Sequence, residues 1–122
     1  MVPFTELVSM WEDVSTVPII VGAAQEKTPM PYVVMNVVQS NPVVVIPRGT
    51  AWTESLVQFT VSASTLAELS PIVQQLQNRF HLVKGELIAD MALMNSGEDY
   101  SKQPNLSGNR GWTSSLEFRI RH

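Results

Sequence analysis

Apolar and polar positions recur with two different periods along the chain, and the changes of period divide it into helices and strands. Residues 3–15 carry apolar side chains at helical spacing, so we expect an amphipathic helix that ends before Pro18. Residues 65–80 show a second helical stripe. Thr65 and Glu68 form a T-x-x-E capping box, which predicts the first turn of this second helix.

Strand-like patterns account for most of the other apolar residues. Residues 53–63 alternate strictly between apolar and polar side chains, which indicates a strand with one buried face, and residues 112–121 repeat the pattern. Residues 87–94 alternate less strictly. Residues 32–38 are rich in valine and apolar on both faces, so we expect a strand that is central or covered on both sides.

Two segments lack either period. Residues 19–31 are predicted to be a loop that follows the short apolar stretch 19–21, and residues 96–111 form a long polar segment that we expect to have no regular structure. The order of the elements predicts a single α+β domain over residues 1–122. Its sheet should have about four strands, antiparallel or mixed, with two helices packed on one face and a projecting loop or hairpin arm.

The arm is predicted within residues 39–52, where a strand-like run of apolar residues lies between Pro42 and Pro47. Because proline cannot donate to a ladder, this run should be an edge strand or a projecting arm. An exposed apolar run of this kind requires a cover, so we expect it to pack against another subunit. Arginine and aromatic residues are enriched at interface centres. The candidate interface residues of this segment are Val43, Val44, Val45, Ile46, Arg48 and Trp52.

A second candidate interface lies in the polar segment 96–111. Its low apolar content cannot offset the entropy of ordering, so we expect it to become ordered only on a partner. Tyr100 would be the anchor, with Glu98, Asp99 and Arg110 as polar contacts at the rim. An ordinary hairpin tip is the alternative interpretation.

The periodic faces also predict which side chains are buried together. Trp11 and Trp112 lie on the apolar faces of their elements and should belong to the core. Where the second helix crosses the sheet, the predicted core residues are Phe59, Val61, Leu76, Phe80, Leu116 and Phe118.

Composition and charge exclude several classes of protein. The net charge is −3 and no basic run is present, which argues against nucleic-acid binding as a main activity. No apolar run reaches the length of a membrane span, and the acidic N-terminal residues do not resemble a signal peptide. Only 16% of residues are charged, so much of the surface can be buried against a partner without desolvating ions.

Catalytic and metal-binding patterns are also missing from the sequence. There is no cysteine, and His81 and His122 lack the spacing of metal ligands. His81 is interpreted as an ordinary helix-end residue, and His122 is expected to fray. No nucleophile motif or phosphate-binding loop occurs, so we expect no cofactor, no metal and no enzymatic activity.

Three segments follow one another in a familiar order: the proline-flanked strand PMPYVVMNVV (29–38), the strand that runs directly into a helix, ESLVQFTVSASTLAELSPIVQQLQNRF (54–80), and the alternating strand GWTSSLEFRIRH (111–122). This layout, with a helix before it, resembles the tail terminator proteins of long-tailed bacteriophages and prophages, also described as tail completion or tail-to-head joining proteins. The resemblance covers nearly the whole chain. It concerns the order of the elements and the general character of the sequence, not a diagnostic motif. The apolar VVVI run between prolines is longer than a generic loop of that layout.

The resemblance implies a virion structural protein that forms a homohexameric ring, caps the tail tube and joins the tail to the head. Its implied partners are further copies of the chain, the tail tube protein and a head or neck connector protein. The protein would be made in the host cytoplasm and reside in the tail, and DNA would pass through the ring without specific binding.

Other interpretations of the same residues stay open. One is another phage neck or baseplate assembly subunit. A second is a small α+β module that captures a peptide or protein by adding a strand to its sheet edge. A third is an enzyme whose active site is completed by oligomerisation.

Overall fold

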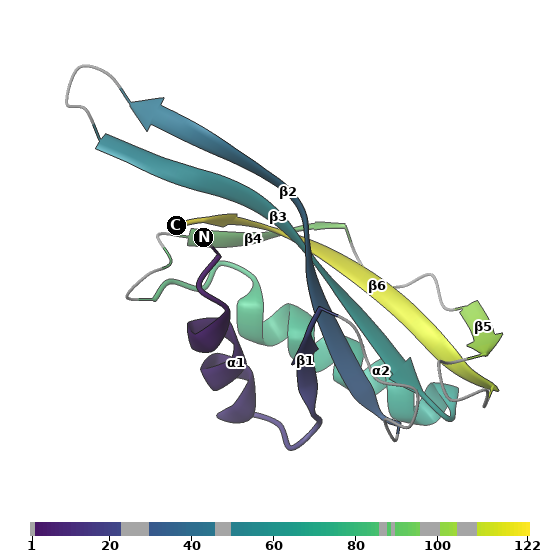
Figure 1. Cartoon of the computed structure of the whole chain (residues 1–122). Coiled ribbons are helices and arrows are strands. Elements are labelled where there is room, and N and C mark those ends of the chain that lie inside the picture. The colour runs from purple at the N-terminus through teal and green to yellow at the C-terminus, as the bar shows by residue number, and fades with distance from the viewer. Residues whose placement is uncertain are drawn as a thin grey trace.

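The computed structural model describes residues 2–22, 30–45, 50–85, 88, 90–95, 101–104 and 110–122. Both helices lie on the same face of a single sheet (Figure 1). The predicted α+β class with two helices on one face is therefore confirmed. In chain order the elements are α1 (Phe4–Glu12), β1 (Ile19–Val21), β2 (Tyr32–Val45), β3 (Thr50–Ala63), α2 (Leu66–Phe80), β4 (Asp90–Asn95), β5 (Ser101–Pro104) and β6 (Arg110–Arg121).

The sheet is mixed, with the strand order β1-β2-β3-β6-β4 and with β5 paired to β6. Strand β1 runs parallel to β2, and the other pairs are antiparallel. The four strands that the alternation predicts correspond to β2, β3, β4 and β6. Because β3 and β6 lie at the centre and are joined over ten residue pairs, from Glu54↔Arg121 to Ala63↔Trp112, they form the platform on which α2 packs.

Two short strands were not expected from the sequence. The prediction of a loop over 19–31 was wrong for residues 19–21, which form β1 against residues 33–35 of β2. The prediction of a structureless segment over 96–111 was wrong for residues 101–104 and 110–111, which pair with one another in the β5–β6 ladder. Backbone hydrogen bonds hold such ladders, so a polar segment can join a sheet edge without any apolar periodicity.

The prediction that residues 32–38 form a strand that is central or covered on both sides is confirmed over residues 33–35, where β2 lies between β1 and β3, and not beyond them. Strand β2 does have neighbours on both edges at residues 33–35, and Val33 and Met35 are fully buried. Val37 and Val38, however, are 40% and 52% exposed. The helices cover only one face of the sheet, and β2 continues past the end of the helix layer (Figure 1), in agreement with the exposure of Val37 and Val38.

The helices follow their sequence signals closely. Thr65 Oγ1 accepts a hydrogen bond from the Glu68 backbone N–H at 3.2 Å, which confirms the cap predicted for α2. Helix α1 ends at Glu12, three residues earlier than predicted. The segment after α1 is held against the helix by the Trp11 indole, whose Nε1 donates a hydrogen bond to the Val17 carbonyl oxygen at 2.8 Å.

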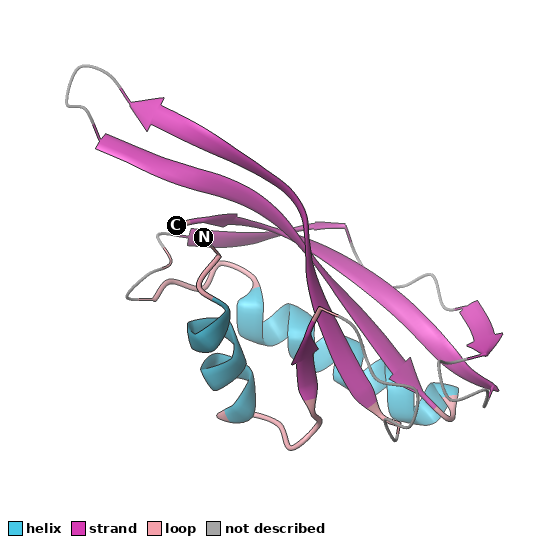
Figure 2. Ribbon diagram, in the orientation of Figure 1, coloured by secondary structure: helices cyan, strands magenta, loops and turns pink. Residues whose placement is uncertain are grey.

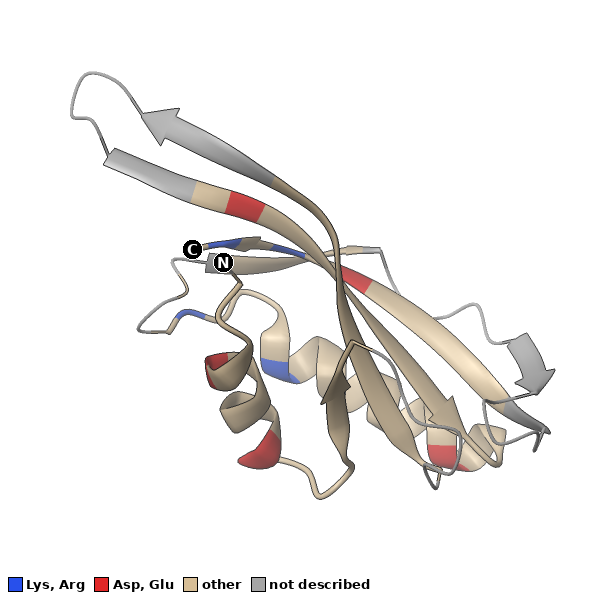
Figure 3. Ribbon diagram, viewed as in Figure 1, with Lys and Arg blue, Asp and Glu red and all other residues tan. Residues whose placement is uncertain are grey.

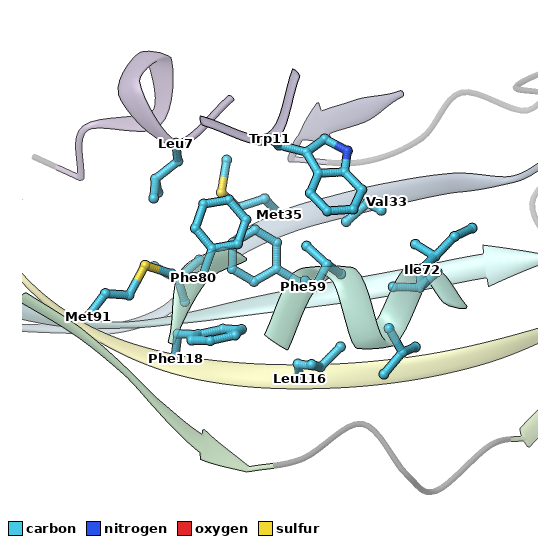
Figure 4. Packing of buried hydrophobic residues seen from close by; sticks show 14 of the residues in the cluster. Leu7, Trp11, Val33, Met35, Phe59, Ile72, Phe80, Met91, Leu116 and Phe118 are labelled. Atoms are coloured by element: carbon cyan, nitrogen blue, oxygen red, sulfur yellow. The ribbon is translucent and has the colours of Figure 1, made fainter. Parts of the chain in front are cut away.

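Aromatic side chains fill the space between the helices and the sheet (Figure 4). The rings of Phe59 and Phe80 stack with centroids 5.2 Å apart, and Phe118 meets both of them edge-on. Trp11 is fully buried, as predicted, and Trp112 is half-buried against the same cluster. The predicted core is confirmed, since the following residues are all 0% exposed: Phe59, Val61, Leu76, Phe80, Leu116 and Phe118.

Strands β2 and β3 continue together beyond the helix layer and form the predicted projecting hairpin (Figure 2). Their antiparallel register runs on to the pair Val45↔Thr50, past a bulge between Val37 and Gln39. We call residues 41–45 and 50–54 the arm. Strand β6 ends beside Glu54 of β3, at the start of the arm. Beyond Thr53, which bonds to His122, the arm consists of β2 and β3 alone.

Candidate assembly surface

The arm brings together part of the predicted interface. Val43, Val44 and Val45 lie in the last residues of β2, and Trp52 lies directly opposite Val43 in the β2–β3 register. Residues 46–51 separate Val45 from Trp52 in the sequence, and the ladder places the two strands side by side on the same short ribbon. Ile46 and Arg48 lie outside the described residues.

Of the second predicted interface, the structure places only Arg110. Arg110 begins β6 and stands opposite Pro104 of β5, whereas the other end of β6, at Arg121, stands opposite Glu54 beside the arm. Arg110 therefore lies at the opposite end of β6 from the arm. Glu98, Asp99 and Tyr100 lie outside the described residues.

Pro42 sits in the arm without breaking the ladder, and the register gives the reason. Thr53 exchanges both backbone hydrogen bonds with His122, at 2.8 and 2.9 Å, so the backbone of Thr53 points toward β6. Pro42 is the partner of Thr53 across the β2–β3 pair, which is consequently a non-hydrogen-bonded pair. The missing N–H of Pro42 thus faces away from β3, toward the open edge of β2. A proline in this place removes a donor from the edge and discourages strand addition.

The opposite edge of the sheet, along β4, is covered by the segment that follows α2. Leu82 donates its backbone N–H to the Met91 carbonyl at 2.7 Å, and His81 Nδ1 accepts the Leu93 N–H at 3.0 Å. Leu82 adopts a left-handed backbone, with φ of 62°, to make this contact. His81 is therefore more than the ordinary helix-end residue that the sequence suggested, because its imidazole occupies an edge position that another strand would otherwise take.

The β2 edge is covered along residues 33–35. Strand β1 pairs with these residues, and the flanking residues Pro18 and Gly22 add hydrogen bonds from Val33 N to Pro18 O and from Gly22 N to Met35 O. Among the described residues, nothing pairs with this edge from Asn36 onward. There the bulge after Val37 and then Pro42 interrupt the regular row of donors.

A chain of hydrogen bonds crosses three strands where the arm begins. The hydroxyls of Ser40 and Ser55 share a hydrogen bond of 2.9 Å, and Ser55 Oγ lies 2.9 Å from His122 Nε2 in a second one. Ser40 lies in β2, Ser55 lies in β3 and His122 follows β6 directly. We call these three residues the root relay. The expectation that His122 frays was wrong, since its backbone and side chain both bond to β3.

Sequence reasoning missed the serine–histidine contact, although one signal was available. Ser55 has the same parity as Val57 and Phe59 in the alternation of residues 53–63, so a polar residue stands at a position facing the core side. Ser55 is 1% exposed, so its hydroxyl is buried in this arrangement. The relay satisfies this buried hydroxyl and joins the three strands at the base of the arm.

A groove of about 630 Å³ opens beside the root relay, between the start of α1 and the ends of β3 and β6. Apolar and small polar side chains dominate its wall. The lining residues are Val2, Pro3, Phe4, Thr5, Glu6, Thr53 and His122.

Residues of both charge signs lie on β3 and β6 near the arm (Figure 3). Arg119 Nε lies 3.5 Å from Glu54 Oε1, and both side chains are about one third exposed. Such a pair contributes little to stability. A smaller hollow of about 160 Å³ lies beside the pair, next to Leu56 and Met94, and Met94 is 56% exposed.

Two features are absent from the described part of the chain. Three or more His, Asp or Glu side chains nowhere gather there into a group that could hold a metal ion. Neither of the two described helices has the length and apolar character needed to span a bilayer. In the comparisons with known proteins, no protein-family model matches this chain and no curated protein matches it.

Proposed function

We propose that this protein is a structural assembly subunit that forms a ring at the end of a phage or prophage tail and joins the tail to the head. The observation that carries the proposal is the arm. Residues 43–45 and Trp52 extend on a ribbon past the helix layer, where neither helix reaches them. An apolar ribbon of this kind is stabilised when a neighbouring subunit covers it.

Low charge supports assembly through this region. Glu54 is the one ionisable residue in the arm strands, residues 41–45 and 50–54. Packing the rest of the ribbon against a neighbour removes no ion from water, so the desolvation cost of association is small. The net charge of −3 per chain makes copies repel one another, and moderate salt should therefore strengthen association.

The protection of both sheet edges disfavours the alternative of a module that captures peptides by strand addition. His81 and Leu82 cover β4, while β1, the bulge and Pro42 restrict β2. A peptide-capturing edge needs an uninterrupted row of donors and acceptors. Contacts through the faces of the arm and sheet remain the better route to a partner.

Sedimentation velocity and native mass spectrometry of the purified chain test the proposal. We expect a discrete closed oligomer, with six copies implied by the resemblance, that is more populated in moderate salt than in low salt. Negative-stain micrographs should show rings with an open centre. A chain that stays monomeric at high concentration in both salts, and does not form a ring on isolated tails, contradicts the proposal.

A pair of variants assigns the contact to the arm. Replacing Val43 and Val44 together by serine should abolish the oligomer while leaving the fold intact, because the core lies elsewhere. Val38→Ser is the matched control, since Val38 is an exposed valine of the same strand outside the arm. If both proteins assemble like the unaltered chain, the arm is not the contact between copies.

A further inference from the structure

We infer that the groove beside the root relay receives the arm of a second copy of this chain. The inference rests on the proposed function, and it names the site on the neighbouring subunit to which the arm binds. Three properties of the molecule support it: the size of the groove, its chemistry, and the direction in which the arm leaves the sheet.

The groove, with a volume of about 630 Å³, has room for a short extended segment. Pro42, Val43, Val44 and Val45 are four consecutive residues without a charge.

The chemistry of the groove suits this segment. Val2, Pro3 and Phe4 line the groove at the start of α1, and Thr5, Glu6, Thr53 and His122 complete its lining. Phe4 packs against the hydrophobic core, so this part of the lining rests on a rigid support. Residues 42–45 carry no charge. Their insertion therefore adds no charge repulsion to that between two copies of net charge −3.

The direction of the arm makes the occupant a second copy. Thr53 lines the groove, and its partner in the ladder is Pro42. From that pair the strands run outward to the pair Val45↔Thr50, about 10 Å further along. An intact β2–β3 ladder consequently carries residues 43–45 away from their own groove. The same arm can enter the groove of a neighbour, and repetition of this head-to-tail contact closes a ring.

The natural absence of cysteine makes a disulfide test direct. Thr5 lines the groove and is exposed, so Thr5→Cys places a thiol at the mouth of the site. Val44→Cys places one on the arm. The two single variants are mixed under mild oxidation. The control is a mixture of the Val44→Cys and Ser115→Cys variants, because Ser115 is an exposed residue of β6 that does not line the groove. Sedimentation of each reduced mixture shows whether the chains assemble.

We expect the arm–groove mixture to form disulfide-linked dimers about tenfold faster than the control mixture, because assembly raises the effective concentration of the two thiols. Equal rates in the two mixtures, in protein that assembles, contradict the groove assignment and leave the proposed function standing. Absence of assembly in all mixtures and in the unaltered chain counts against the proposed function itself.

Obstruction of the groove provides a second readout that needs no cross-link. Thr5→Trp should weaken assembly by about tenfold or more in dissociation constant, since the indole occupies the space of the entering strand. Ser9→Trp is the matched control, on an exposed position of the same helix one turn further from the groove. Loss of assembly in both variants, or in neither, overturns the assignment.

Discussion

Strands β2 and β3 pass through two different environments, and the same kinds of residue behave differently in each. Beneath the helices, Val33 and Met35 of β2 and Phe59 of β3 are 0% exposed. Past the end of the helix layer, Val37 and Val38 of β2 are 40% and 52% exposed. Valine-rich composition and antiparallel pairing continue across the boundary, whereas burial does not.

The difference teaches that pairing alone does not provide a cover. A two-stranded ribbon in water is marginally stable, and a second layer packed on the sheet is what removes apolar surface from solvent. In the helix-backed region α1 and α2 supply that layer within the chain. Val37 and Val38 lack such a layer, and the proposed function has a neighbouring subunit supply one to the arm that follows them.

The largest expected effect is in the helix-backed region. Phe118→Ala should lower the free energy of unfolding by about 3–5 kcal/mol, because it removes a ring that contacts both Phe59 and Phe80 in a fully buried cluster. Val38→Ala should change it by less than about 0.5 kcal/mol. Urea unfolding of the two variants measures the contrast, and similar losses in both would remove the distinction between the regions.

An intermediate effect is expected at the boundary. Ser55→Ala breaks the root relay and should cost about 1 kcal/mol, since Ser40 and His122 each lose a hydrogen-bond partner. Amide hydrogen exchange should quicken in the arm and stay unchanged in α2. Ser115→Ala, whose hydroxyl is exposed 3.3 Å from Thr60 Oγ1, is the control. Equal behaviour of the two variants would show that the relay does not anchor the arm.

The smallest effect on folding is expected within the arm itself. Pro42→Val should change the free energy of unfolding by less than about 0.5 kcal/mol, because the proline faces the open edge and donates nothing to β3. The variant gains an edge N–H next to an apolar run, so light scattering should reveal open-ended aggregation beyond the closed oligomer. A loss of more than about 2 kcal/mol would instead indicate that the register of the arm is incorrect.

The candidate site was predictable only in part. Two prolines around an apolar run indicated the arm, because the loss of a donor is a local property of the residue. The groove could not be predicted, since its walls come from residues 2–6, Thr53 and His122, which are distant in sequence. The placement of Arg110 away from the arm likewise depended on the antiparallel register, which brings the C-terminal end of β6 to the arm.

By itself the sequence determined the helices, the four principal strands and the core. Each of these depends on a periodic pattern or a cap, which acts over a few residues, as at Thr65 in α2 and in the alternation around Phe59. Tertiary structure alone decided the addition of β1 and β5, the cover of β4 by His81, and the meeting of Ser55 with His122. These contacts are made by backbone groups or single polar atoms between distant segments, and such contacts leave no periodic trace in the sequence.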